Sequence, residues 1–119
     1  MKPGRGIVVV LSLDPTLGHE QKGVRPCVVV SAPEVIAEQR YPLVCVVPIT
    51  STPGEGALYP RLEPGASGLR KLSYALIDQL RSVDKSRVTR FLGRVSAEEL
   101  KSIDEGLLLY LGLLDTASL

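Results

Sequence analysis

Residues 24–51, VRPCVVVSAPEVIAEQRYPLVCVVPITS, decide the fold because two runs of β-branched and apolar residues flank a short connection. The runs 25–31 and 43–50 each have the length and composition of a β-strand and are bounded by Pro and Ser. Residues 32–42, which join them, are too few for the crossover that parallel strands need. The two runs are therefore predicted to form an antiparallel pair.

A symmetric connection also fixes the register of this pair. Opposed residue numbers in an antiparallel pair have a constant sum, here about 75, so Arg25 is predicted to lie across from Thr50. Because side chains alternate between the two faces, Cys27 shares a face with Arg25 and Thr50, whereas Cys45 points the other way. Pro48 has no N–H for a ladder hydrogen bond, so it predicts an edge position or a bulge that would shift the register by one residue.

The rest of the first two thirds of the chain is also predicted to be mainly β-structure. Residues 6–13 form a strand, and residues 72–84 alternate well enough for one long strand. The connection 51–71 is rich in Pro and Gly, so it is predicted to be mobile, with one short strand near 57–63. DKSR, residues 84–87, is predicted to be a turn or a single helical turn.

Residues 96–114, SAEELKSIDEGLLLYLGLL, predict the one long helix. Ser96 and Glu99 have the spacing of a capping box. One helical stripe carries the apolar residues Leu100, Ile103, Leu107, Leu111 and Leu114. Strands followed by a helix predict a mainly β, α+β fold: a small, strongly bent sheet or barrel with a C-terminal helix, in a single domain over residues 1–119.

Composition excludes several classes of protein. With 4% aromatic residues and no Trp, the chain does not favour an aromatic platform for stacking several bases. The run IVVVLSL is too short for a membrane span and lacks a cleavage motif, so a cytoplasmic protein without membrane contact is expected. Cys27 and Cys45 both lie in valine-rich runs without metal-ligand spacing, which predicts free thiols, no disulfide and no metal site.

Charge is unevenly distributed although the net charge is only +1. Residues 70–94 are basic, and residues 95–119 are acidic. The basic stretch holds Arg70, Lys71, Arg81, Lys85, Arg87, Arg90 and Arg94 against Asp78 and Asp84. Such a stretch either contacts phosphates or is a solvated face of charged side chains.

The loop GHEQKG, residues 18–23, is predicted to hang over the end of the strand pair where Arg25 and Thr50 meet. A guanidinium has a planar fork of donors that matches phosphate oxygens and can stabilise charge on a pentacovalent phosphorus. Thr50 adds a hydroxyl donor. These residues suit phosphate chemistry, and the alternative that Arg25 only pairs with a nearby carboxylate such as Glu20 stays open.

Three segments in this order resemble the MazF/PemK family of toxin endoribonucleases: RGIVVVLSLDPTLGHEQKGVRPCVVVS, VVPITST and IDQLRSVDKSRV. The resemblance covers nearly the whole chain, and GHEQKGVRP is its most specific part. It implies an SH3-like small β-barrel of the MazF, CcdB and PemK kind with a C-terminal helix. It also implies a homodimeric type II toxin that cleaves single-stranded RNA without cofactor or metal and is inhibited by an acidic, MazE-like antitoxin peptide.

The resemblance also assigns roles to residues. Arg25 and Thr50 match the family's catalytic arginine and threonine. Together with the basic stretch, it predicts a set of RNA-binding residues: His19, Glu20, Gln21, Ser51, Asp78, Gln79, Arg81 and Arg87. The chain departs from the family at Ile7, near which an acidic residue and an aromatic one are common, and at Asp78, where glutamate is common. The departure near Ile7 affects the edge of the RNA groove more than the chemistry.

The reaction that the resemblance implies is attack of a ribose 2′-hydroxyl on its own 3′-phosphate, which leaves a 2′,3′-cyclic phosphate and a 5′-hydroxyl. Glu20, His19 and a water-relayed phosphate oxygen are the candidates for the proton acceptor. Two alternatives stay open: a gyrase-poisoning toxin of the same fold, against which the pairing of Arg25 with Thr50 argues, and a non-catalytic peptide-binding module.

Overall fold

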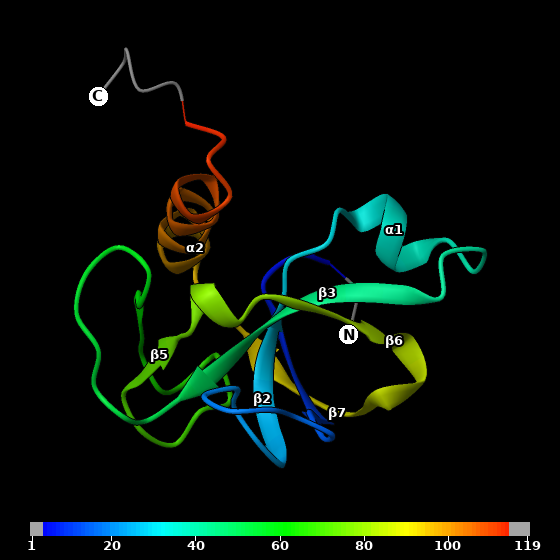
Figure 1. The fold of residues 1–119 in the computed structure, drawn as a ribbon, viewed down its shortest axis with the longest axis horizontal. Coiled ribbons are helices and arrows are strands. Elements are labelled where there is room, and N and C mark those ends of the chain that lie inside the picture. The colour runs from blue at the N-terminus through cyan, green and yellow to red at the C-terminus, as the bar shows by residue number, and fades with distance from the viewer. Residues whose placement is uncertain (1–3, 115–119) are drawn as a thin grey trace.

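The computed structural model describes residues 4–114, which fold into a strongly curled antiparallel sheet with two helices (Figure 1). The sheet order is β4-β5-β3-β2-β1-β7, and β6 pairs with a second part of β3. In chain order the elements are β1 (Ile7–Ser12), β2 (Val24–Val29), α1 (Pro33–Ala37), β3 (Leu43–Thr50), β4 (Arg61–Leu62), β5 (Ser73–Ala75), the 3-10 turn η1 (Ile77–Gln79), β6 (Arg81–Asp84), the 3-10 turn η2 (Lys85–Arg87), β7 (Val88–Arg94) and α2 (Ala97–Tyr110).

The predicted register of the central pair is confirmed. β2 and β3 are antiparallel, with Cys27 opposite Pro48 and Val28 opposite Val47. This is the expected constant sum, so Pro48 does not shift the register. Continued along the strands, the same register brings the start of β2, with Arg25, to the end of β3, with Thr50.

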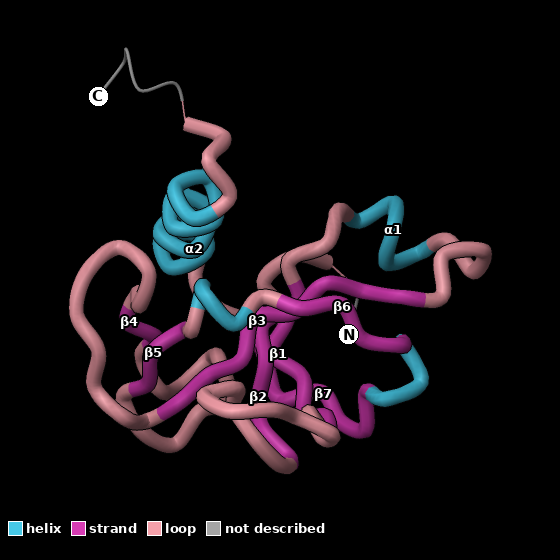
Figure 2. Tube along the Cα trace, viewed as in Figure 1, coloured by secondary structure: helices cyan, strands magenta, loops and turns pink. Residues whose placement is uncertain are grey.

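Pro48 instead marks the point where β3 changes neighbours on its other edge. β6 pairs with Leu43–Val46, β5 pairs with Ile49–Thr50, and between them the carbonyl of Pro48 accepts a hydrogen bond from the Leu76 N–H at 2.8 Å. The single strand predicted over 72–84 is therefore wrong. Because Pro48 has no N–H, the hydrogen-bond ladder along this edge of β3 is interrupted there. The facing segment therefore forms two short strands, β5 and β6, joined by the turn η1 (Figure 2).

Two elements were not predicted from the sequence. β7 pairs antiparallel with β1 and occupies the last part of the basic stretch, Val88–Arg94, where no strand was expected. α1 occupies part of the connection 32–42. The short strand expected near 57–63 is limited to β4, and the predicted turn at 84–87 is η2.

The sheet buries apolar side chains on both faces, which explains its near-continuous valine runs. One face carries Val28, Val47 and Ile49 against Ile103 of α2. The opposite face encloses a second cluster that includes Val9, Leu11, Cys27 and Val46, with Ile36 of α1 packed against it. In Figure 1, α2 stands over the end of the sheet with β5, and α1 over the end with β6.

Both cysteines are free thiols, as predicted. Cys27 is fully buried in the second cluster, and this burial raises the pKa of its thiol to about 12. Cys45, on the opposite face of the sheet, is half-buried, and burial raises its thiol pKa as well. Neither thiol is activated as a nucleophile in this environment.

The capping box of α2 is confirmed, with the Ser96 hydroxyl accepting the Glu99 N–H and the Glu99 carboxylate accepting the Ser96 N–H. The predicted apolar stripe is confirmed as far as Leu107. It is wrong at Leu111, which is 50% exposed because the helix ends at Tyr110, beyond the sheet. Exposed apolar side chains gather there: Leu108, Leu109, Tyr110, Leu111 and Leu113. No helix within residues 4–114 is long and apolar enough to cross a membrane.

The connection between β3 and β5 is anchored, in contrast to the mobile segment that its composition predicted. Leu62 and Leu69 are buried in the first cluster. Ala66 lies so close to β7 that a Cβ added at Gly93 would be 2.2 Å from its carbonyl oxygen, a distance that only glycine permits. The anchored segment therefore fixes the backbone of the residues that follow it.

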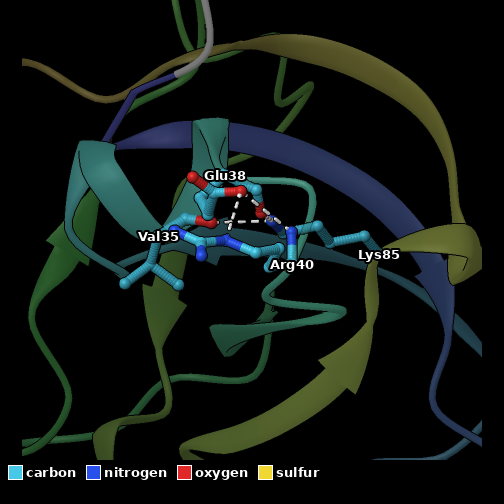
Figure 3. Close-up of polar contacts among 4 residues, drawn as sticks. All are labelled: Val35, Glu38, Arg40 and Lys85. Atoms are coloured by element: carbon cyan, nitrogen blue, oxygen red, sulfur yellow. Dashed lines mark hydrogen bonds and ion pairs between the residues drawn. The ribbon is translucent and has the colours of Figure 1, made fainter.

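Hydrogen bonds from Lys85 hold α1 on the sheet (Figure 3). The ammonium of Lys85, in η2, donates to the carbonyl oxygens of Val35 at 2.6 Å and Glu38 at 3.0 Å, at the C-terminal end of α1. Arg40 forms an ion pair with the Glu38 carboxylate at 3.3 Å. Cations satisfy carbonyls left unpaired at the end of a helix, so this contact keeps Ile36 against the second cluster.

Candidate functional site

Arg25 and Thr50 line one depression of ≈ 200 Å³ at the rim of the sheet. Arg25 is exposed, and its Nε donates to the carbonyl oxygen of Lys22 at 2.9 Å. Within the described residues its two terminal nitrogens have no hydrogen-bond partner, and it forms no ion pair with Glu20 or any other carboxylate. The Nε contact therefore orients the guanidinium and leaves the donor fork available to a ligand.

Thr50 is held by the turn that follows it. Its Oγ1 accepts the backbone N–H of Thr52 at 3.1 Å, which fixes the side chain at the end of β3. The hydroxyl proton is not used in this contact, so Thr50 can donate a hydrogen bond into the depression. Ser51, predicted from the resemblance, lines the same depression.

A larger depression of ≈ 550 Å³ adjoins the first, and Thr50 lines both. Four of the predicted RNA-binding residues meet in it: His19, Gln21, Asp78 and Gln79. These four also line a third depression of ≈ 310 Å³, to which Glu20 and Arg81 contribute. The loop before β2 and the turn η1 thus line the same two depressions, and Thr50 lies where the larger of them meets the first depression. The three depressions together form the groove.

Gln79 fastens the loop to this groove. Its Oε1 accepts the backbone N–H of Gln21 at 2.5 Å, and its Nε2 donates to the carbonyl oxygen of His19 at 3.2 Å. One side-chain amide thereby satisfies both a donor and an acceptor of the loop backbone. Gln79 is therefore a positioning residue for the loop in addition to lining the groove.

Two arginines predicted to bind RNA hold the start of the same loop. Arg81 donates to the carbonyl oxygen of Leu13 at 2.7 Å. Arg87 donates to the carbonyl oxygens of Ser12 at 3.3 Å and Asp14 at 3.1 Å, and it lines none of the three depressions. In this structure both guanidinium groups support the backbone of the loop, and their contact with RNA stays a prediction.

Glu20 is also engaged within the loop, because its carboxylate accepts the backbone N–H of Leu17 at 2.5 Å. Its own N–H donates to the carbonyl oxygen of Leu17 at 3.1 Å, which closes the turn. His19 differs, since its side chain is exposed and lines the larger depression together with Thr50.

Two tyrosines of the groove were missed by the sequence analysis. Tyr59 and Tyr74 both line the larger depression, and Tyr74 is the partner of Thr50 in the β3–β5 pairing. The Tyr59 hydroxyl donates to Asp78 Oδ2 at 2.7 Å, and this hydrogen bond to a carboxylate raises the Tyr59 pKa. No spacing in the sequence signals Tyr59, because its position depends on how the long connection folds back over the end of β3.

Metal-ligating side chains do not gather in the described part of the chain. Between residues 4 and 114, no group of three or more His, Cys, Asp or Glu residues has the arrangement needed to hold a metal ion. The polar groups of the three depressions are cations and hydroxyls around Arg25 and Thr50, and amides, the His19 imidazole and the carboxylates of Asp78 and Glu20 further along. The cations and hydroxyls can bind anions, and the amides and carboxylates can bind the polar edges of organic ligands.

A curled sheet with a C-terminal helix and a basic depression around Arg25 and Thr50 at one rim defines a small β-barrel protein with an exposed candidate site. Comparison with known proteins extends this description. The sequence model of the family described as "PemK-like, MazF-like toxin of type II toxin-antitoxin system" matches residues 4–111.

Individual relatives agree with this match. The chain is 37% identical over 115 residues to endoribonuclease MazF9 of Mycobacterium tuberculosis, covering 92% of this chain and 96% of the relative. It is 33% identical over 113 residues to endoribonuclease EndoA of Bacillus subtilis, covering 93% and 96%. A crystal structure of MazE–MazF from Deinococcus radiodurans superposes with a TM-score of 0.73 at 30% identity, covering 96% and 99%.

The chain belongs to the PemK-like, MazF-like toxin family of type II toxin–antitoxin systems. The family resemblance noted in the sequence is confirmed, and so is the predicted small barrel with a C-terminal helix.

We predict that Gln79→Leu loosens the loop without unfolding the sheet, because it removes both hydrogen bonds to the loop backbone. A hydrogen bond of this kind contributes about 1 kcal/mol, so the Gln21 amide should exchange with deuterium roughly fivefold faster or more. Exchange at Val28 in β2 serves as the internal reference, and Gln39→Leu, at an exposed position after α1, is the matched control variant. An unchanged exchange rate of the Gln21 amide in the Gln79→Leu variant would contradict the inference that Gln79 holds the loop.

Proposed function

We propose that this chain is the toxin of a type II toxin–antitoxin pair and that it is a metal-independent endoribonuclease that cleaves single-stranded RNA with Arg25 and Thr50 as catalytic residues. The observation that carries the proposal is the depression that these two side chains share, with the donor fork of Arg25 unpaired among the described residues. Family membership and two relatives named as endoribonucleases support it.

The chemical step that fits these groups is transesterification within the RNA. The ribose 2′-oxygen forms a bond to the adjacent 3′-phosphorus, and the bond from phosphorus to the 5′-oxygen of the next nucleotide breaks. The proton of the 2′-hydroxyl leaves with a base, and the departing 5′-oxygen gains a proton. The products are a 2′,3′-cyclic phosphate and a 5′-hydroxyl, and the nucleophile comes from the substrate itself.

Arg25 and Thr50 would act on the charge that develops on the phosphate. The terminal nitrogens of Arg25 bind non-bridging oxygens, and the hydroxyl of Thr50 donates to the same group. Donors aimed at developing charge are worth about 2.7–4 kcal/mol each at oxyanion sites. Arg25 is a charge stabiliser and not the base, because a guanidinium stays protonated at any working pH.

The groove beside Thr50 would bind the nucleotides that flank the cleaved bond. His19 contributes an imidazole ring to the same depression as Thr50, which supports a role as substrate contact close to the reaction. Gln21, Asp78 and Gln79 provide hydrogen-bonding groups for base edges, which are accessible in unpaired RNA and hidden in a duplex. The proposed substrate is therefore single-stranded RNA such as mRNA, and the proposed place of action is the cytoplasm.

The proposed partners are an antitoxin and a second copy of the chain. An acidic, MazE-like peptide would satisfy the same guanidinium fork as RNA, and the MazE–MazF assembly of Deinococcus radiodurans supports such a pairing. The exposed apolar end of α2 supports a homodimer.

An acidic antitoxin peptide should displace a labelled, uncleavable RNA from the protein in a titration. Simultaneous binding of both ligands with unchanged affinities would exclude a shared groove.

We predict that Arg25→Ala and Thr50→Val each lower the cleavage rate about a hundredfold or more while the circular dichroism spectrum stays that of the wild type. Both side chains lie at the rim and contribute little to the core, so folding should be preserved. Arg40→Ala, which removes an exposed arginine beside α1, is the control and should cleave at the wild-type rate.

Rates should be measured on an unstructured RNA and on a fully paired one, with cleavage expected only of the first. An Arg25 variant that keeps more than a tenth of the wild-type rate would contradict the assignment. Failure of the wild-type protein to cut either RNA would favour a gyrase-poisoning toxin or a peptide-binding module of the same fold.

A further inference from the structure

Many basic side chains of the described chain are committed to partners inside the protein. Arg5 forms an ion pair with Asp104 at 2.5 Å, and Arg61 lies 3.8 Å from the Glu63 carboxylate. Lys85 is bound to carbonyl oxygens at the end of α1, as Arg81 and Arg87 are to those of the loop before β2. Within the basic stretch 70–94, backbone carbonyl oxygens therefore engage donors of Arg81, Lys85 and Arg87.

Three basic residues are different, because they face the same depression without an acidic neighbour. Arg25, Arg70 and Lys71 line it together with hydroxyl-bearing side chains, and no Asp or Glu contributes to its wall. Within residues 4–114, none of the three forms an ion pair. Like charges held around one depression repel one another, so the arrangement is relieved when an anion lies between them.

The positions of Arg70 and Lys71 are fixed by the packing of the segment before and after them. Leu69 is 8% exposed and belongs to the first apolar cluster. On the other side, the Ser73 hydroxyl donates to the carbonyl oxygen of Lys71 at 2.9 Å, and Tyr74 pairs with Thr50. The two cations are thus anchored a few residues from a strand pairing that includes a proposed catalytic residue.

The surroundings of Thr50 divide into two chemically distinct sides. The larger depression, on one side, has tyrosine rings, amides, the His19 ring and the Asp78 carboxylate, which suit the faces and donor edges of nucleobases and not a phosphate. The smaller one, on the other side, has the three cations and three hydroxyl groups, which suit phosphates. A strand of RNA that crosses Thr50 would therefore turn its bases to the first side and its backbone to the second.

We propose that Arg70 and Lys71 bind the backbone phosphate next to the cleaved one, so that this depression holds two consecutive phosphates of the RNA. The inference rests on the proposed function, since it takes Arg25 and Thr50 as the groups on the cleaved phosphate. Arg70 and Lys71 contact the substrate equally in the ground state and the transition state. They therefore contribute to binding, and they leave the chemical step unchanged.

The expected signature is a change in KM with little change in kcat. Each lost phosphate contact should also lower the salt dependence of affinity, by about 0.7 in the slope of log K against log salt for a single strand. Arg70→Gln with Lys71→Gln should raise KM about tenfold or more at low salt and flatten this slope, while kcat stays within twofold of the wild type. Lys101→Gln, at an exposed site on α2, is the control that should change neither quantity.

A modified substrate makes the test specific to one phosphate. Once the cut site in a short RNA is known, a neutral methylphosphonate replaces the phosphate on its 5′ or its 3′ side. For the wild type, one of these two substitutions should raise KM as much as the double substitution in the protein does. For the Arg70→Gln, Lys71→Gln protein, the same substitution should have no further effect, because the contact is already gone.

The outcomes separate this inference from the proposed function. Wild-type levels of KM and salt dependence in the double variant would overturn the two-phosphate subsite while leaving the endoribonuclease intact. A methylphosphonate effect of equal size in wild type and variant would also overturn it. A wild-type protein that cleaves no RNA would overturn the proposed function and this inference together.

Discussion

The antiparallel pairing of β2 with β3 is the constraint on which the candidate site depends. It carries Arg25, at the start of one strand, and Thr50, at the end of the next, to the same rim of the sheet. The short connection 32–42 limits the possible registers, and side chains of both strands pack into one cluster on each face: Val28 and Val47 on one, Cys27 and Val46 on the other. The site therefore rests on the same apolar packing that stabilises the fold.

The groove around this pair is built by polar contacts to backbone atoms. Gln79 binds both a donor and an acceptor of the loop before β2, while Arg81 and Arg87 bind its carbonyl oxygens. Basic side chains consequently divide into two kinds. Arg81 and Arg87 support the loop before β2, whereas Arg25, Arg70 and Lys71 line the depression that Thr50 shares. Sequence position alone does not distinguish the two, since both kinds occur within the stretch 70–94.

Sequence reasoning succeeded where local geometry determines the outcome. The short connection 32–42 fixed the β2–β3 register, the capping box predicted the start of α2, and GHEQKGVRP identified the family. It failed where distant segments decide. The split of residues 72–84 depends on Pro48 in another strand, and the place of Tyr59, Arg70 and Lys71 depends on how the connection after β3 packs against Gly93. β7 was not predicted because its charged residues interrupt the apolar pattern of a strand. It is stabilised by its pairing with β1, which the local sequence does not reveal.

The proposed use of an internal nucleophile can be tested directly by identifying the ends of the RNA fragments formed in the presence of EDTA. Mass spectrometry distinguishes a cyclic phosphate from a linear phosphate by the mass of one water molecule. Attack by the 2′-hydroxyl, with Arg25 supplying the charge stabilisation, predicts 2′,3′-cyclic phosphate and 5′-hydroxyl ends at an undiminished rate. Fragments with 3′-hydroxyl and 5′-phosphate ends, formed only when a divalent metal ion is restored, would contradict the account.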